Sequence, residues 1–213
     1  MSHCVYILTA HADPAAYTVS AVKRLAELIE ARGDEAQVTN LHDIGFDPNF
    51  GPGDLDTYRA FLGGRTLAPP ADVRAEHDKL LRADTFVVAF PVYWWAMPAQ
   101  IKGWFDRVLT SRRAFGTASS NPADSVVAHM SAHVLAVTGG NEAGYASRGY
   151  DAAMRTQIET GILEYSGFRS TSWTWLWDRY KNPEARLEEA CQGVIGAIYA
   201  HKVREKHKVQ IKP

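Results

Sequence analysis

Short, largely apolar runs that alternate with helical segments restrict most strongly how this chain can fold. Such runs occupy residues 3–9, 84–90 and 133–138 and are typical of strands buried on both faces of a parallel sheet. Between them, segments such as 18–31 space their apolar residues as a helix does. Strands that alternate with helices predict βαβ units, and therefore a parallel sheet with helices on both faces.

The rest of the pattern completes a five-stranded sheet. Two further strands are expected at 35–41 and 168–177. The expected helices are, in chain order, 18–31, 54–62, 70–82, 98–110, 151–165 and 183–206, and 42–54 is expected to be mostly loop. Thr18 or Ser20 is expected to cap the first helix. No internal repeat or long linker divides the sequence, so we expect one doubly wound α/β domain over residues 1–213.

Composition excludes several classes of protein. The formal net charge is −1, which gives no electrostatic reason to expect a nucleic acid or an anionic membrane as partner. The N-terminal segment lacks the pattern of a signal peptide, and no apolar run of about 18 residues could span a membrane. Cys4 and Cys191 lie outside any metal or redox spacing, so we expect two buried, reduced thiols in a cytoplasmic protein.

Ligands of open α/β sheets bind beyond the carboxyl ends of the strands, where this sequence places unusual loops. The first loop, residues 9–18, precedes a helix whose N-terminal amides and dipole favour an anion. Thr18 and Ser20 would add hydroxyl donors and His11 an imidazole N–H, so we expect a phosphate or pyrophosphate here. The alternative is an ordinary capped helix start after a solvated loop. The loop has neither a Walker motif nor a G-x-G-x-x-G motif.

The second loop, residues 90–98 (FPVYWWAMP), has three adjacent aromatic residues at a strand end. Three such rings cannot all pack under one sheet and need a flat apolar partner or a subunit interface. Pro91 and Pro98 stiffen the two ends of the turn. The pattern fits a site for an isoalloxazine ring, with a hydrophobic interface without cofactor as the alternative.

The third loop, residues 138–145 (TGGNEAGY), follows another strand. Gly139 and Gly140 let the backbone approach a planar ring and turn its amides toward it. Tyr145 could add a phenol hydroxyl. The alternative is a simple turn.

Together these loops resemble the NAD(P)H dehydrogenase (quinone) family of flavodoxin-like proteins. The most specific stretch is 90–108 (FPVYWWAMPAQIKGWFDRV), and weaker similarity covers nearly the whole chain. The other matching positions are His11, Tyr17, Thr18, Thr138, Gly139, Gly140, Tyr145 and Arg186.

The resemblance implies a flavodoxin-like fold and a flavin-dependent NAD(P)H:quinone oxidoreductase. Hydride would pass in ping-pong order from NAD(P)H through the flavin to a quinone or similar acceptor. The flavin phosphates would lie at His11, Tyr17 and Thr18. The isoalloxazine ring would be held by Pro91, Val92, Tyr93, Trp94, Trp95, Thr138, Gly139, Gly140 and Tyr145. Tyr145 would be the catalytic residue, and Trp94 and Phe115 would contact the substrate.

Further features follow from the resemblance and from departures from it. Arg186 matches an arginine beside the adenosine half of FAD, which, with the long 42–82 segment, favours FAD over FMN. Family members are typically homodimers with sites built from both subunits. Asp151 stands where the best-studied members have a histidine that works with the tyrosine, and a carboxylate cannot offset the negative charge of a reduced flavin. Phe115 lies near the place of a family tyrosine.

Other assignments stay open. The chain could be an electron-carrier flavodoxin or an ancillary subunit of a cation-efflux system, and the sequence leaves open NADH or NADPH as donor and azo dyes, nitroaromatics or chromate as acceptors. His129 and His133 lack the pattern of a zinc site, and we expect no metal. Asp106 and Arg107 are expected to be structural ion partners. Trp173, Trp175 and Trp177 alternate and should share one strand face.

Overall fold

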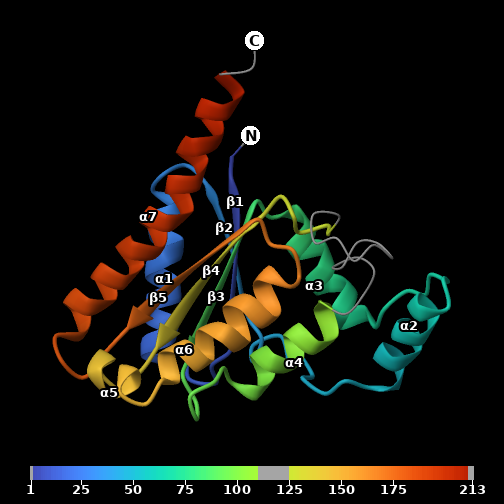
Figure 1. Cartoon of the computed structure of the whole chain (residues 1–213), viewed down its shortest axis with the longest axis horizontal. Helices are drawn as coiled ribbons and strands as arrows, with labels where there is room; N and C mark the ends of the chain where they lie inside the picture. The colour runs from blue at the N-terminus through green and yellow to red at the C-terminus, as the bar shows by residue number, and fades with distance from the viewer. Residues whose placement is uncertain (1, 110–124, 211–213) are drawn as a thin grey trace.

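The computed structural model describes the backbone of residues 2–109 and 125–210, and their side chains as far as residue 200. Within these ranges five parallel strands form one sheet in the order β2-β1-β3-β4-β5 (Figure 1). The strands are β1 (Cys4–Thr9), β2 (Glu35–Asn40), β3 (Thr85–Pro91), β4 (Ser131–Val137) and β5 (Ser170–Leu176). This strand order confirms the predicted doubly wound, flavodoxin-like sheet.

Helices cover both faces of the sheet. One face carries α1 (Tyr17–Glu30) and α7 (Pro183–Gln210). The other carries α3 (Ala71–Arg82), α4 (Ala99–Val108) and a continuous segment made of α6 (Tyr150–Arg155) and the π-helix η2 (Thr156–Glu164). In Figure 1, α2 (Pro52–Leu62) projects to the side beyond α3 and α4, and α5 (Glu142–Ala146) lies near the arrowhead of β5.

The two faces of the sheet bury different kinds of side chain. On the α1–α7 face the buried residues that the structure describes are Val, Ile, Leu, Ala and Cys, without an aromatic ring. The opposite face buries Phe86, Phe90, Trp104 and Phe105 among other rings, and Phe86 stacks on Trp104 at 5.5 Å. The aromatic residues of this chain are therefore concentrated on one side of the sheet.

All five predicted strands are present; the strand expected at 84–90, for example, is Thr85–Pro91. The expected caps of the first helix were wrong. Because α1 already begins at Tyr17, Ala16 takes the N-cap position, and no side chain caps the helix. The Ser20 hydroxyl instead donates to the Ala16 carbonyl (3.3 Å), and Thr18 is buried.

Two helical features differ from the prediction. The short α5 was not expected, because its glycine-containing sequence resembles a turn; the Asn141 side chain caps it by accepting from the Gly144 amide (2.8 Å). The helix expected at 151–165 is divided into α6 and η2. Met154 and Ile158 are buried four residues apart, and Ile158 and Leu163 five apart, so the wider π-helical turn keeps Leu163 facing the core.

Arg107 joins the 42–82 segment to α4. Its guanidinium lies 2.9 Å from Asp54 Oδ2 on α2 and 2.5 Å from Asp72 Oδ2 on α3. A Cβ atom on Gly103 would lie 2.2 Å from the Pro48 carbonyl oxygen, so only glycine allows this close approach. The prediction that Arg107 is a structural ion partner is confirmed, and Asp106 likewise pairs with Lys102 at 2.5 Å.

Cys4 and Cys191 are both free and buried, as predicted. Burial raises the pKa of the Cys191 thiol to about 12. Among the described helices, none combines the length and the apolar character needed to cross a bilayer. The assignment of one domain to residues 1–213 stays a prediction.

Candidate functional site

The carboxyl ends of the strands bring the three predicted loops to one edge of the sheet. The register pairs Thr9 with Asn40, and Val137 with both Pro91 and Leu176, so neighbouring strands end nearly level. The loops after β1, β3 and β4 therefore leave the sheet on the side toward which the arrowheads point in Figure 1. This is the edge at which open α/β sheets bind ligands.

A side chain of the neighbouring strand holds the first loop. The Asn40 side chain accepts from the His11 amide (3.0 Å) and donates to the His11 carbonyl (2.9 Å). The imidazole Nδ1 of His11 accepts from the Asp13 amide (3.0 Å), so the neutral ring carries its proton on Nε2. His11 thus presents a donor, as an anionic ligand requires. Asn40 was not predicted; its signal was a polar residue at the end of the strand next to this loop.

The start of α1 has the properties of an anion site. No side chain caps it at Ala16, and the first amides of a helix have no intrahelical acceptor. Thr18 lies at the same point and is 2% exposed. The buried Thr9 hydroxyl, at the end of β1, has no hydrogen-bond partner among the described residues. A buried hydroxyl without a partner calls for an explanation, and a bound ligand would supply one.

Tyr17 and Arg186 come together where α1 meets α7. The Tyr17 hydroxyl donates to the Pro183 carbonyl at the first residue of α7. Burial raises the pKa of the Tyr17 phenol, and the nearby Arg186 guanidinium acts in the opposite direction. Two of the predicted residues therefore share one surface beside the first loop.

The second loop is a tight turn that displays Trp94 and Trp95. Tyr93 and Ala96 exchange two backbone hydrogen bonds of 3.0 Å, and the two tryptophans between them have φ angles of 49° and 54°. Gly, Asn and Asp usually occupy such positions, and a bulky residue there costs on the order of 1–3 kcal/mol. Trp94 is 88% exposed and Trp95 43%. Large rings held in solvent by a strained turn indicate a ligand or partner surface.

Buried residues anchor this turn on both sides. Pro91 is buried at the end of β3, and the Val92 amide donates to the Val137 carbonyl (2.8 Å). Met97 and Pro98 are buried where the chain enters α4. The turn is thus a fixed projection from the sheet.

The third loop folds back on itself through Thr138. Its hydroxyl accepts from the Gly140 amide (3.0 Å) and lies 2.7 Å from the Tyr145 hydroxyl. A Cβ on Gly140 would lie 2.7 Å from the Tyr145 ring, so the close approach of this ring requires glycine. Contrary to expectation, the Gly140 amide therefore faces inward, whereas the Gly139 amide has no acceptor within the described residues.

Aromatic contacts join the second and third loops to β5. The Trp95 ring lies 4.4 Å from Tyr150, whose ring is 5.9 Å from Tyr145. Tyr145 in turn contacts Trp175 and Trp177 at 5.4 and 5.1 Å. A wall of rings therefore runs along this edge of the sheet.

Trp173 and Trp175 of β5 and Trp177, directly after the strand, lie on one side, as predicted. Trp175 stacks on Trp177 at 4.4 Å and contacts Trp173 at 5.1 Å. All three pack against the aromatic core. Packing is thus their observed role, and the contacts of Trp177 with Tyr145 extend it to the candidate site.

Asp151 has a local structural role. It lies in the first turn of α6, where a carboxylate stabilises the helix dipole. Tyr150, directly before it, was not predicted as a site residue, although its ring connects Trp95 with Tyr145. The sequence signal that could have found Tyr150 was its place next to Asp151, where the chain departs from the family pattern.

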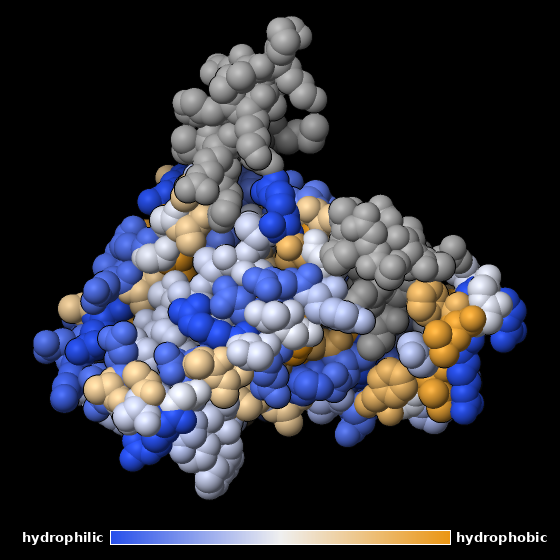
Figure 2. All heavy atoms as spheres, viewed as in Figure 1, coloured by the Kyte–Doolittle hydropathy of each residue, from blue (hydrophilic) through white to orange (hydrophobic). Residues whose placement is uncertain are grey.

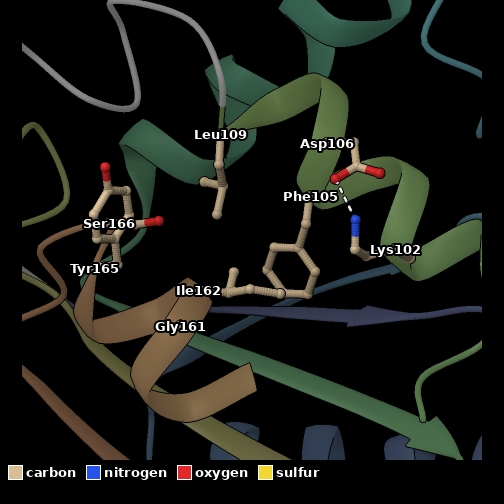
Figure 3. Close-up of a pocket in the computed structure, with 8 residues that line it drawn as sticks. All are labelled: Lys102, Phe105, Asp106, Leu109, Gly161, Ile162, Tyr165 and Ser166. Atoms are coloured by element: carbon tan, nitrogen blue, oxygen red, sulfur yellow. Dashed lines mark hydrogen bonds and ion pairs between the residues drawn. The ribbon is translucent and has the colours of Figure 1, made fainter. Parts of the chain in front are cut away.

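A separate hollow lies between α4 and η2 (Figure 3). Its volume is about 180 Å³, below the roughly 300 Å³ at which ligand pockets begin. Figure 3 shows Phe105 and Ile162 side by side within it and the Lys102–Asp106 pair at its margin. None of the predicted site residues lines it; the lining residues are Lys102, Phe105, Asp106, Leu109, Gly161, Ile162, Tyr165 and Ser166.

Two further predictions concern residues outside this edge. Phe115 lies outside the described residues. His129 Nε2 is 3.3 Å from the Ala83 carbonyl oxygen, and His133 hydrogen-bonds to Ser172 (2.6 Å). Over residues 2–109 and 125–200, whose side chains the structure describes, no group of three His, Cys, Asp or Glu side chains is placed to hold a metal.

Comparison with known proteins agrees with this geometry. A family model described as a flavodoxin-like fold matches residues 4–195. NAD(P)H:quinone oxidoreductase from Methanothermobacter marburgensis has a similar structure, with a TM-score of 0.78, 26% identity, and coverage of 92% of this chain and 96% of that one.

Two relatives with similar sequences are named as quinone dehydrogenases. NAD(P)H dehydrogenase (quinone) 1 of Rattus norvegicus is 29% identical over an alignment of 181 residues that covers 76% of this chain and 64% of the rat protein. The match thus spans less than two thirds of that relative. Ribosyldihydronicotinamide dehydrogenase (quinone) of Pongo abelii is 27% identical over 211 residues, covering 91% of this chain and 87% of the relative.

Proposed function

The chain belongs to the flavodoxin-like fold family, and on this premise we propose that it is an NAD(P)H:quinone oxidoreductase that acts through a bound flavin. One observation carries this conclusion. An uncapped helix start, an exposed aromatic turn and a glycine loop converge at one edge of the sheet. The names of the relatives and of the similar structure support it.

The residues at this edge fit a flavin. An anionic phosphate suits the donor Nε2 of His11 and the amides around Tyr17 and Thr18, and the unpartnered Thr9 hydroxyl at the end of β1 is a further donor. A flat ring suits the strained tryptophan turn. We assign the ring to Pro91, Val92, Tyr93, Trp94, Trp95, Thr138, Gly139, Gly140 and Tyr145.

We favour FAD over FMN. Arg186 and Tyr17 together extend the candidate site from the first loop to the start of α7. FMN ends at its phosphate, whereas FAD continues into an adenosine half that this surface could hold. The partly buried Arg186 offers a cation and a planar face to that half.

The chain would orient two flat rings and support the charge that develops between them. A bound flavin supplies the capacity to accept a hydride from NAD(P)H and to pass it to a quinone. Trp94 and Trp95 would exclude water and align the rings, with Trp94 in contact with the substrate. The Tyr145 hydroxyl, poised by Thr138 at 2.7 Å, would donate a hydrogen bond to the ring edge. One slot serving both substrates gives a ping-pong order.

We further propose a cytoplasmic homodimer. Figure 2 shows apolar residues gathered on the α2 side of the molecule. A surface of this kind is typical of a protein interface. The exposed residues there are Phe50, Leu55, Tyr58, Leu62 and Leu67. Light scattering during gel filtration is expected to give twice the chain mass of 23.6 kDa, and a monomer would contradict the dimer.

Steady-state kinetics test the proposed activity. The flavin-loaded protein should oxidise NADH or NADPH in the presence of a naphthoquinone, and double-reciprocal plots at several quinone concentrations should be parallel. Intersecting lines would contradict the ping-pong order. A flavin-loaded protein that oxidises neither nucleotide in the presence of the quinone would contradict the enzymatic assignment.

A further inference from the structure

The connection after β5 is clamped onto the glycine loop. The Asp178 amide donates to the Gly140 carbonyl (2.9 Å), and the Arg179 amide donates to the Thr138 carbonyl (3.4 Å). Asp178 and Asn182, at the two ends of the connection, have φ angles of 49° and 48°. Asp and Asn tolerate this left-handed conformation better than most residues, so the connection has a defined shape over the loop.

This clamp places Arg179 beside Gly139. A Cβ on Gly139 would lie 3.3 Å from Tyr180 Cε2 and 3.9 Å from Arg179 Nε. The guanidinium also lies 4.7 Å from the centre of the Tyr180 ring and donates to the Tyr180 hydroxyl. Tyr180 therefore holds the cation against the glycine whose amide is free.

Among the described residues, Arg179 forms no ion pair within 4 Å. Within the part of the chain that the structure describes, its guanidinium contacts the ring and hydroxyl of Tyr180 rather than a carboxylate. Tyr180 is 75% exposed, so the pair lies on the open side of the loop. The Arg179 guanidinium is a positively charged, planar group.

We infer that Arg179 supplies the positive charge that offsets the negative charge gained by the flavin on reduction. This inference rests on the proposed function. Hydride transfer breaks a nicotinamide C–H bond, moves two electrons and a proton to the ring, and leaves the ring with one negative charge. Charges fixed in place before the reaction stabilise such a change most effectively. Tyr145 is neutral and Asp151 has the wrong sign, so neither can supply this charge.

Removal of this charge should destabilise the reduced flavin more than the oxidised one. Arg179→Gln keeps a polar side chain but loses the charge, and Arg179→Lys keeps the charge without the planar group. Lys181→Gln is the matched control, because Lys181 is an exposed cation on the same connection. The measurement is the two-electron midpoint potential of the bound flavin, determined by equilibration with a reference dye.

Arg179→Gln is expected to lower the ratio of reduced to oxidised flavin about tenfold at fixed potential, which is about 30 mV for a two-electron couple. The affinity for oxidised flavin should stay within twofold. Arg179→Lys should recover most of the shift, and Lys181→Gln should change the ratio less than twofold.

Two results would overturn the inference while leaving the proposed function intact: an unchanged potential in Arg179→Gln, or an equal shift in Lys181→Gln. If the wild-type chain binds no flavin, the proposed function fails first and this inference with it. Circular dichroism of each variant identifies any loss of fold, and Arg179→Lys provides the second comparison if Arg179→Gln does not fold.

Discussion

The two faces of the sheet differ in what they bury and in what they expose. The α1–α7 face has an aliphatic core, and its clearest polar contact is the surface pair of Arg24 and Glu188 at 2.7 Å. The α3–α4 face is aromatic, buries the ionised groups of Glu76 and Arg107, and ends at the strained tryptophan turn. The first face follows from ordinary helix and strand packing, whereas the second buries charged groups that need protein partners and carries a strained turn whose cost the proposed ligand site would explain.

Glu76 illustrates the second face. It is 0% exposed, and its carboxylate accepts from the Tyr6 hydroxyl, from Trp104 Nε1 (2.9 Å) and from Lys79 Nζ (2.6 Å). Burial, followed by the charge of Glu76, raises the pKa of the Tyr6 phenol well above its usual value. A buried charge is tolerated when its hydrogen bonds are complete, and here they tie β1, α3 and α4 together.

The largest effect on stability is expected from Arg107→Met. The change leaves the carboxylate of Asp54, 4% exposed, without its cation, and breaking such a buried pair costs about 3–5 kcal/mol. Lys102→Met on the same helix breaks only the exposed pair with Asp106 and should cost less than about 1 kcal/mol. Urea unfolding measures both, and equal losses would show that the buried pair has no special importance.

The aliphatic face could be predicted closely from the sequence, and the aromatic edge only in part. Strands such as 84–90 and the helix at 18–31 follow from apolar periodicity, because burial on a sheet or helix face leaves that pattern directly. The aromatic turn was visible because Tyr93, Trp94 and Trp95 are adjacent. The positive φ angles of Trp94 and Trp95 could not be predicted, because tertiary anchoring of the turn overrides the backbone preference of tryptophan.

The site residues that were not predicted make their contacts from neighbouring strands and connections. Asn40 holds His11 from a neighbouring strand, and Arg179 reaches Gly139 from the connection after β5. Such pairs depend on strand order, which local sequence patterns do not contain. The inward turn of the Gly140 amide likewise depends on the position of Thr138 Oγ1.

The second largest effect is expected from Tyr145→Phe, and it concerns the rate of hydride transfer rather than stability. Loss of one donor aimed at developing charge slows reactions by about a hundredfold. The ring contacts with Trp175 and Trp177 remain, so flavin binding and stability should change little. Stopped-flow reduction of the bound flavin by NAD(P)H measures the step. Tyr165→Phe, at an exposed tyrosine beside η2, is the control, and equal rates for the two variants would show that the Tyr145 hydroxyl is idle.

A smaller, pH-dependent effect is expected on the aliphatic face. The pKa of Cys191 is raised from 9.0 to about 12 by burial, so the folded state holds this proton more tightly than the unfolded state. Its contribution to stability is complete below pH 9 and is lost as the pH rises toward 12. Thermal unfolding at several pH values should show a shallower alkaline loss in Cys191→Ala. An unchanged slope would contradict this origin.

The smallest effect is expected from Glu188→Gln. The hydrogen bond with Arg24 lowers the pKa of Glu188 from 4.5 to about 2, so its stabilisation is present above pH 4.5 and is lost as the pH falls toward 2. The side chains of Arg24 and Glu188 are 37% and 42% exposed, and solvent screens the pair. In Glu188→Gln, the thermal unfolding midpoint should fall less on acidification than it does in the wild type. A loss of stability larger than that of Arg107→Met would contradict the difference that we describe between the two faces.

Titration of the purified protein with FAD and with FMN, followed by visible absorption and flavin fluorescence, tests most directly whether the aromatic edge holds a flavin. We expect one flavin per chain, tighter binding of FAD than of FMN, and strong quenching of flavin fluorescence by the tryptophans of the turn. A protein that takes up neither flavin would contradict the account.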